Sequence, residues 1–498
     1  MYTIGFDLGS SSVKVALVNS NTGKMVHLVQ EPAIEMPISS KQPQYAEQDP
    51  VMWWANACKA SKRLLAEAAI DLKQITAIGI SYQMHGLVLL DKNGAVLRDA
   101  IIWCDSRAVT LGETALNQLG KDFCTANLYN SPGNFTASKL AWVKENEPEI
   151  YAKTACFMLP GDFLAYKLCG EMTTTKNGLS EGILWNFKTQ HVAKAVLNYY
   201  HIDYNLIPTL VDNFCPQGKL SQNAAVQCGL PTGIPLCYRA GDQPNNALSL
   251  NVLNEGEVAL SAGTSGVIYA LSTCSSPTEI SKINHFVHVN YRPEKPIIGT
   301  LLNINGVGAQ YRWLRDICGE SSYEQMHEQA VSIPVGSDGV VVLPFGNGAE
   351  RMFNNRVIGT HLLHLNVNSH RTAHLIRATL EGIAFAFAYG LEILEQQALP
   401  LHTFRAGNDN LFQAQIFGET LATIIQRDIE IYHTTGAVGA AIAAGLKGGN
   451  IDDHHYSSAF AANYSHTITP HKNNTDYLKA YAAWKDDLNL FLTALHHA

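Results

Sequence analysis

The chain has 498 residues, 46% hydrophobic content, ten cysteines and a formal net charge of −8. This length exceeds what one hydrophobic core usually organises, so we expect at least two domains. The negative charge and the lack of a Lys/Arg run argue against nucleic acid or an anionic membrane as partner. No apolar run reaches the ~18 residues that cross a bilayer. Scattered cysteines without a CxxC pair, and no signal-peptide pattern at the start, predict a cytoplasmic protein.

The first elements read as a small antiparallel sheet. Apolar alternation in residues 2–30 is interrupted by a Gly/Ser turn at 9–12 and an Asn-Thr-Gly turn, which predicts a three-stranded meander. A helix is expected from Asp49 as N-cap and Pro50 at its first position to about residue 69. A strand follows at residues 75–82. Strand–helix alternation further along predicts an α/β fold with a mixed sheet covered by helices.

The opening pattern recurs near the middle of the chain. Residues 257–272 again read as a strand, a Gly-Thr-Ser-Gly turn and a second strand. We interpret this as two related domains, residues 1–249 and 250–498. Helices are expected at residues 371–397 and 411–426. The small-residue segment 435–449 predicts close helix packing.

Two glycine-hydroxyl turns are candidate phosphate sites. Exposed backbone N–H groups in such turns can bind phosphate oxygens, although each turn alone is equally compatible with an ordinary hairpin tip. One turn per domain favours a polyphosphate held between the domains. Asp7 precedes the first turn and is a candidate water-mediated ligand of magnesium. The chain has no GxxxxGK[ST] motif, so this is not a Walker loop.

Further candidates follow predicted strands, where α/β sheets bind ligands. "QMHG" follows the strand at 75–82, and its His85 is either a ligand or a core histidine. Trp103, Asp105 and Arg107 follow another apolar strand, with a plain surface ion pair between the last two as the alternative. The turn "AGNDN" at 406–410 lies between a predicted strand and helix, where a nucleotide can approach the backbone. A simple connection is equally compatible.

Asp242 is the candidate catalytic carboxylate. It lies in "RAGDQPNNA" (239–247), behind the short apolar strand "GIPLCY" and between Gly241 and Pro244. A carboxylate in this context either forms a turn or acts as a catalyst. Gly241 is expected to let the backbone bend, and Pro244 to stiffen the residues after it.

Taken together, these motifs resemble the FGGY family of carbohydrate kinases over nearly the whole chain. The resemblance rests on "GFDLGSSSVKV", "AEQDPVMWW", "GISYQMHGLVLLD", "AIIWCDSR", "AGDQPNNA", "LSAGTSGV" and "LEGIAFAFAYGLEIL". It implies two related actin-like ATPase (ribonuclease H-like) domains around a central cleft, with the sugar on the first domain and the nucleotide on the second. It also implies ATP and magnesium as cofactors and allows a homodimer.

The resemblance implies a role for each candidate residue. Asp242 would be the general base, and Asp7 would face the magnesium. The sugar would contact Met84, His85, Gly86 and Gln243, together with Asp162 of "PGDF", which stands where the family often has "PKD". The nucleotide would contact Gly9, Ser10, Ser11, Ser12, Gly263, Thr264, Gly407 and Asn410.

The activity implied is ATP-dependent phosphorylation of a ketose. "QMHG" with "EQDP" is most similar to the family members that convert D-xylulose to D-xylulose 5-phosphate. The alternatives are another sugar of this family (ribulose, sedoheptulose, gluconate or glycerol) and a non-catalytic module that binds ATP or sugar. The retained acid at position 242 argues against the last.

Overall fold

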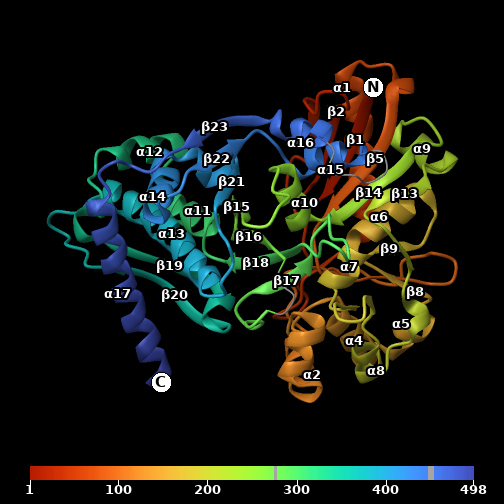
Figure 1. Cartoon of the computed structure of the whole chain (residues 1–498), viewed down its shortest axis with the longest axis horizontal. Helices are drawn as coiled ribbons and strands as arrows, with labels where there is room; N and C mark the ends of the chain where they lie inside the picture. The colour runs from red at the N-terminus through yellow and green to blue at the C-terminus, as the bar shows by residue number, and fades with distance from the viewer. Residues whose placement is uncertain (274–276, 447–453, 498) are drawn as a thin grey trace.

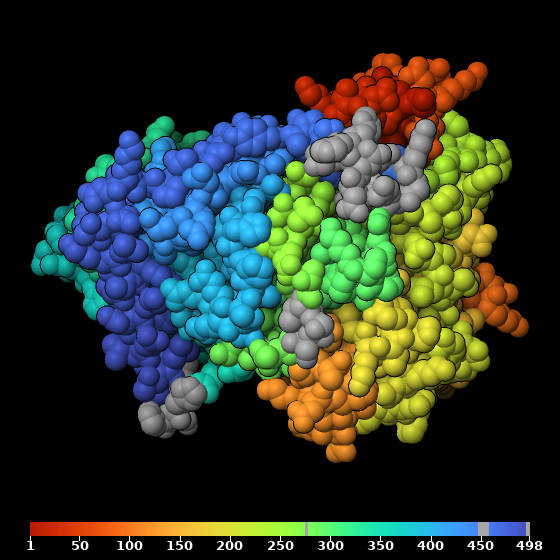
Figure 2. All heavy atoms as spheres, viewed as in Figure 1, coloured from red at the N-terminus to blue at the C-terminus, as the bar shows by residue number. Residues whose placement is uncertain are grey.

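The computed structural model describes residues 1–273, 277–446 and 454–497. Two mixed β-sheets form the centres of two neighbouring lobes (Figure 1). The first sheet comes entirely from residues 1–249, here called the first half, and the second sheet comes entirely from residues 250–498, the second half. Figure 2 shows the cyan and blue residues of the second half gathered on one side, with green residues at the junction.

The first sheet has six strands. Their order is β13 (Phe214–Lys219), β14 (Pro235–Gly241), β5 (Ile75–Tyr82), β1 (Tyr2–Leu8), β2 (Val13–Asn19) and β3 (Met25–Glu31). The strands β1, β2 and β3 form the predicted antiparallel meander, and β5 and β14 extend it in parallel.

The second sheet has seven strands. Their order is β17 (Asn284–Val287), β18 (Ile298–Ile304), β16 (Gly266–Ser272), β15 (Glu257–Ala262), β21 (Thr403–Gly407), β22 (Ile429–Tyr432) and β23 (Tyr464–Ile468). Here β15 pairs antiparallel with β16 and parallel with β21, as β1 does with β2 and β5. The shared pattern confirms the predicted relation between the two halves.

Helices cover both sheets. The first half contributes α1 (Pro50–Ala68), α2 (Val109–Leu119), α3 (Lys121–Phe123), α4 (Thr136–Asn146), α5 (Pro148–Lys153), α6 (Pro160–Cys169), α7 (Lys176–Glu181), α8 (Lys194–Tyr200), α9 (Gln222–Cys228) and α10 (Asp242–Ser249). The second half contributes α11 (Gly308–Cys318), α12 (Tyr323–Val331), α13 (Thr372–Glu395), α14 (Gln415–Ile425), α15 (Gly436–Ala444), α16 (His454–Ala461) and α17 (Thr475–His497). The predicted start of α1 is confirmed, since Asp49 accepts a hydrogen bond from Val51 N at 2.8 Å and Pro50 follows it.

Short strand pairs complete the fold. They are β4 (Glu47–Gln48) with β7 (Ala100–Ile101), β6 (Val88–Leu90) with β8 (Cys156–Met158), β9 (Thr173–Thr175) with β12 (Thr209–Val211), β10 (Trp185–Asn186) with β11 (His191–Val192), and the long hairpin β19 (Val341–Glu350) with β20 (Arg356–Leu363). Within the described ranges, no helix is both long and apolar enough to cross a membrane.

Helix α15 of the second half packs on the first sheet (Figure 1). Its alanines approach two strand glycines so closely that a Cβ on Gly5 would lie 1.9 Å from Ala437 O, and one on Gly79 2.1 Å from Ala440 O. The small residues of this segment therefore do permit close packing, as predicted, but largely against strands. Its last predicted residues, 447–449, lie outside the described part of the chain.

Candidate active site

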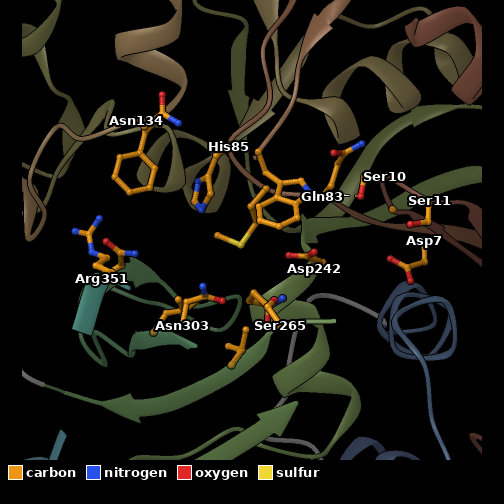
Figure 3. Close-up of a pocket in the computed structure, with 18 of the residues that line it drawn as sticks. Asp7, Ser10, Ser11, Gln83, His85, Asn134, Asp242, Ser265, Asn303 and Arg351 are labelled. Carbon is orange, nitrogen blue, oxygen red and sulfur yellow. Dashed lines mark hydrogen bonds between the residues drawn. The ribbon is translucent and has the colours of Figure 1, made fainter. Parts of the chain in front are cut away.

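A pocket of about 490 Å³ lies between the two halves (Figure 3). The predicted site residues that line it are Asp7, Gly9, Ser10, Ser11, Ser12, Met84, His85, Asp242 and Gln243. The second half contributes Ser265, Val267, Asn284, Leu301, Asn303 and Arg351. The volume is in the range of typical small-molecule sites.

Asp242 is the first residue of α10, directly after β14. Gly241 at the junction of strand and helix has an ordinary φ of −57°, so the glycine is not required for an unusual backbone conformation. Glycine is needed there for space, because a Cβ would lie 2.4 Å from Glu181 Oε2 and 2.6 Å from Met84 Cγ. Pro244 fits the first turn of a helix, where its missing N–H is not required. The strand end thus aims the Asp242 side chain into the pocket.

The carboxyl group of Asp242 holds its proton more tightly than an exposed aspartate. Burial, and then the negative charge of Asp7, raise its pKa to about 7, while hydrogen bonds from Gln243 oppose the shift. A carboxyl group with a pKa near the working pH is well suited to accept a proton from a hydroxyl.

The Gly9–Ser12 turn forms the wall beside Asp7. The main-chain N–H of Gly9 donates a hydrogen bond of 3.0 Å to the Ser12 carbonyl, and this bond closes the turn. Asp7 lies against the start of α15, where a Cβ on Gly436 would be 2.6 Å from Asp7 Oδ2. Figure 3 shows Asp7 above this blue helix, on the side of the pocket that also carries Ser11. Two carboxylates and several hydroxyls on one wall form the hard oxygen environment that Mg²⁺ prefers.

His85 lies toward the other end of the pocket in a strained, left-handed conformation with φ of 62°. Its Nδ1 lies 2.9 Å from the Glu181 carbonyl oxygen, which can only accept, so Nδ1 carries the proton and Nε2 is an acceptor. Burial, and then the charge of Lys139, lower its pKa to about 3, so the ring is neutral. Lys139 Nζ also donates to the His85 carbonyl at 2.9 Å. The histidine is therefore a fixed, uncharged hydrogen-bonding group.

Two predicted sugar contacts lie outside the pocket lining. Asp162 is buried in α6, where its Oδ1 lies 3.1 Å from Arg239 Nε and its Oδ2 accepts from Leu159 N. This ion pair holds the carboxylate away from the pocket. Gly86 packs under Pro160, since a Cβ there would lie 2.5 Å from Pro160 Cγ. We therefore assign neither residue a contact with the sugar.

The four candidate residues of the second half for the nucleotide are not among the residues that line the pocket. A Cβ on Gly263 would be 3.8 Å from Asn410 Nδ2, so the two loops meet. Asp409 lies within electrostatic reach of Lys14, which lines the pocket. The turn after Gly407 leads into a short 3₁₀ helix, η6 (Asn410–Gln413), and α14 begins only at Gln415. The expected glycine turn at an α-helix N-terminus is therefore not present.

The structure places Trp103 in the pocket lining and the side chains of Asp105 and Arg107 outside it. Trp103 lines the pocket, and its Nε1 donates to Ser10 Oγ at 3.4 Å. Asp105 and Arg107 form a buried ion pair of 2.7 Å that Glu47 joins at 2.8 Å, in place of a plain surface bridge.

Sequence reasoning missed several lining residues. Asn134 follows a Ser-Pro-Gly turn, a loop signal that was available. No comparable local signal marks Asn284, Asn303 or Arg351, because only the tertiary fold of the second half brings them to the pocket.

Two related mixed sheets, with a pocket that residues of both halves line, define an actin-like ATPase fold. The xylulose kinase from Rhodospirillum rubrum superposes with a TM-score of 0.87 at 25% identity, covering all of both chains. The Plasmodium falciparum glycerol kinase with ADP has the same fold, with a TM-score of 0.86 at 19% identity and 99% and 98% coverage. The Bacillus subtilis xylulose kinase is 29% identical over 457 residues, 90% of this chain and 88% of its own.

Residues 2–249 match the N-terminal domain, and residues 258–447 the C-terminal domain, of the FGGY family of carbohydrate kinases. The chain belongs to this family and is a carbohydrate kinase.

Proposed function

We propose that this enzyme transfers the γ-phosphoryl group of ATP to a ketose, with D-xylulose as the substrate and D-xylulose 5-phosphate as the product. The observation that carries the proposal is the position of Asp242 in the pocket shared by both halves. On one side lie Asp7 and the Ser10–Ser12 loop, which suit a polyphosphate. On the other lie Met84 and His85, which suit a sugar. Similarity to xylulose kinases of other organisms supports the choice of sugar.

Asp242 acts as the general base in this proposal. A sugar hydroxyl is a weak nucleophile, so its proton passes to Asp242 Oδ as the oxygen attacks the γ-phosphorus of ATP, whose bond to the bridging oxygen breaks to release ADP. Gln243, which donates hydrogen bonds to the carboxylate, keeps it aligned. The neutral His85 orients the sugar through Nε2 without competing for the proton.

The phosphate end depends on Asp7 and the two glycine-hydroxyl loops. The negative charge of Asp7 helps to raise the pKa of Asp242, and a cation bound at this end would offset that repulsion. Asp7 would hold magnesium through its water ligands. When bound, magnesium supplies positive charge to the phosphate oxygens. The Gly9–Ser12 loop and the loop at Gly263 and Thr264 position the polyphosphate, and the loops at Gly407 and Asn410 border the adenosine.

A substrate panel tests this proposal. ADP release would be measured with D-xylulose, D-ribulose, sedoheptulose, gluconate and glycerol at matched concentrations. The highest kcat/KM is expected for D-xylulose. A higher value for another sugar would replace the substrate but keep the reaction, whereas ATP hydrolysis that no sugar stimulates would favour an ATP-binding module that does not phosphorylate sugars.

A further inference from the structure

The end of the pocket remote from Asp7 holds two polar side chains of the second half whose hydrogen bonds are incomplete. Asn284, at the start of β17, is only 7% exposed, and its Oδ1 has no hydrogen-bond partner. Arg351 follows β19, and its buried Nε has no partner either. Both line the same pocket as Asp242. Buried polar atoms normally find a partner, so two unpaired ones in a binding pocket point to a ligand.

Arg351 is held firmly even though one of its donors is free. Its Nη2 donates to the Ile280 carbonyl at 3.0 Å. The preceding Glu350 accepts from Asn305 N at 3.0 Å, which ties the end of the β19 strand to the end of β18. Figure 3 shows Arg351 on the same side of the pocket as Asn134, away from Asp7 and Ser11. The guanidinium is thus a preorganised donor at the sugar end.

The positive charge of Arg351 also reaches the sugar wall of the first half. It is one of the charges that lower the pKa of His85, after burial and Lys139. Arg351 and His85 line the same pocket from opposite halves. His85 Nε2 and Asn284 Oδ1 offer acceptors there, and Arg351 offers a donor.

The donor and acceptor types define what fits. A guanidinium can only donate, so it requires an oxygen that accepts, for which a carbonyl oxygen is the simplest match, and an amide oxygen requires a donor such as a hydroxyl. A 1-hydroxy-2-ketone carries both groups on adjacent carbons. In a 2-ketopentose phosphorylated at its terminal 5-hydroxyl, this is the end remote from the reacting oxygen.

We propose that Arg351 and Asn284 bind the C2 carbonyl and the C1 hydroxyl of the substrate, so that the second half selects ketoses. This inference rests on the proposed ketose kinase activity. It makes the sugar itself a link between the halves: the 5-hydroxyl meets Asp242 of the first half, and the carbonyl meets Arg351 of the second. In a polyol the oxygen on carbon 2 is a hydroxyl on a tetrahedral carbon, so it lies out of the carbonyl plane and brings a hydrogen that needs an acceptor of its own, and it meets the guanidinium less well than a carbonyl does.

The test compares D-xylulose with xylitol, its analogue reduced at C2, in wild type and Arg351→Met. Loss of a hydrogen bond from a charged donor should lower kcat/KM for D-xylulose roughly 10- to 100-fold, mainly through KM. The values for xylitol and the KM for MgATP should change less than about threefold. Arg312→Met, which removes an exposed arginine of α11, is the matched control. It should change neither the kcat/KM for D-xylulose nor the kcat/KM for xylitol.

Asn284→Ala provides a second variant in case Arg351→Met folds poorly. It should lower kcat/KM roughly 3- to 10-fold for D-xylulose and xylitol alike, because both carry the C1 hydroxyl that Asn284 is proposed to bind. Equal losses for D-xylulose and xylitol in Arg351→Met, or no loss for D-xylulose in Asn284→Ala, would overturn the inference. So would a wild-type preference for D-xylonate that Arg351→Met abolishes, because the arginine would then bind a carboxylate. A wild type that phosphorylates no ketose would instead overturn the proposed function.

Discussion

The side-chain amide of Asn245 donates a 2.9 Å hydrogen bond to the main-chain carbonyl of Gly436. This bond joins two helices that each carry part of the site. Helix α10 begins with Asp242, and helix α15 begins at Gly436, directly against Asp7. The two carboxylates are thus positioned by helices from different halves that are tied together at their first turns. This gives the first asparagine of the "PNNA" segment a structural role.

Replacing Asn245 by alanine should therefore lower kcat more than it weakens sugar binding. The partly buried Gly436 carbonyl loses the bond that joins the two helices, at a cost of about 0.5–1.5 kcal/mol, and Asp242 shifts relative to Asp7. We expect a kcat lowered roughly tenfold, a lower melting temperature and a nearly unchanged Kd for D-xylulose. Steady-state kinetics and calorimetry measure all three.

The neighbouring Asn246 is a matched control, since the described part of the chain offers its side chain no hydrogen-bond partner. Asn246→Ala should behave like wild type. Equal effects of the two substitutions would show that the Asn245 bond does not position the site.

The rate should depend on the ionisation of Asp242. Burial and the charge of Asp7 raise its pKa to about 7, and only the ionised form accepts a proton. Because the protonated form dominates below this value, kcat/KM for the sugar should fall about tenfold per pH unit below pH 7 and level off above it. A profile measured from pH 5.5 to 8.5 at fixed free magnesium checks this. A flat profile across that range would contradict the assignment of a raised pKa to the base.

Lys139 should matter for sugar binding although it lies outside the pocket lining. It is fully buried, and its Nζ donates to the carbonyls of His85 and Ile102 at 2.9 Å each. Lys139→Met removes both bonds and releases the left-handed His85 from its strained conformation. We expect a KM for D-xylulose raised about tenfold, with an unchanged KM for MgATP.

The exposed Lys153 supplies the comparison, because Lys153→Met removes a lysine at the end of α5 without touching the histidine. A Lys139→Met enzyme that retains the wild-type KM for the sugar would show that His85 keeps its conformation unaided.

The sequence predicted those features that depend on local patterns. The meander at residues 2–30, the α1 start and the repeated hairpin at 257–272 follow from alternation, capping and turn residues. Asp7, His85 and Asp242 were found because each lies at or after the end of a strand. The structure brings all three to one pocket.

Features that depend on tertiary packing were missed. Arg351 lies in the connection between the two strands of a long hairpin, and no local pattern distinguishes it from a surface arginine. The packing of α15 against the first sheet was missed, because a run of small residues indicates close packing but does not identify the element that packs against it. Asp162 was misplaced because its partner, Arg239, lies far away in sequence and holds it in the core. Gly241 was explained by backbone freedom, whereas its neighbours Glu181 and Met84 leave no room for a side chain.

The central claim is that Asp242 accepts the proton of the sugar hydroxyl, and Asp242→Asn tests it most directly. Single-turnover phosphoryl transfer and the Kd for D-xylulose would be measured on this variant and on Asp428→Asn, which alters an exposed aspartate before β22. We predict that Asp242→Asn loses at least about 10²-fold in transfer while its Kd stays within about threefold, and that Asp428→Asn matches wild type. Near-normal transfer by Asp242→Asn would contradict the account.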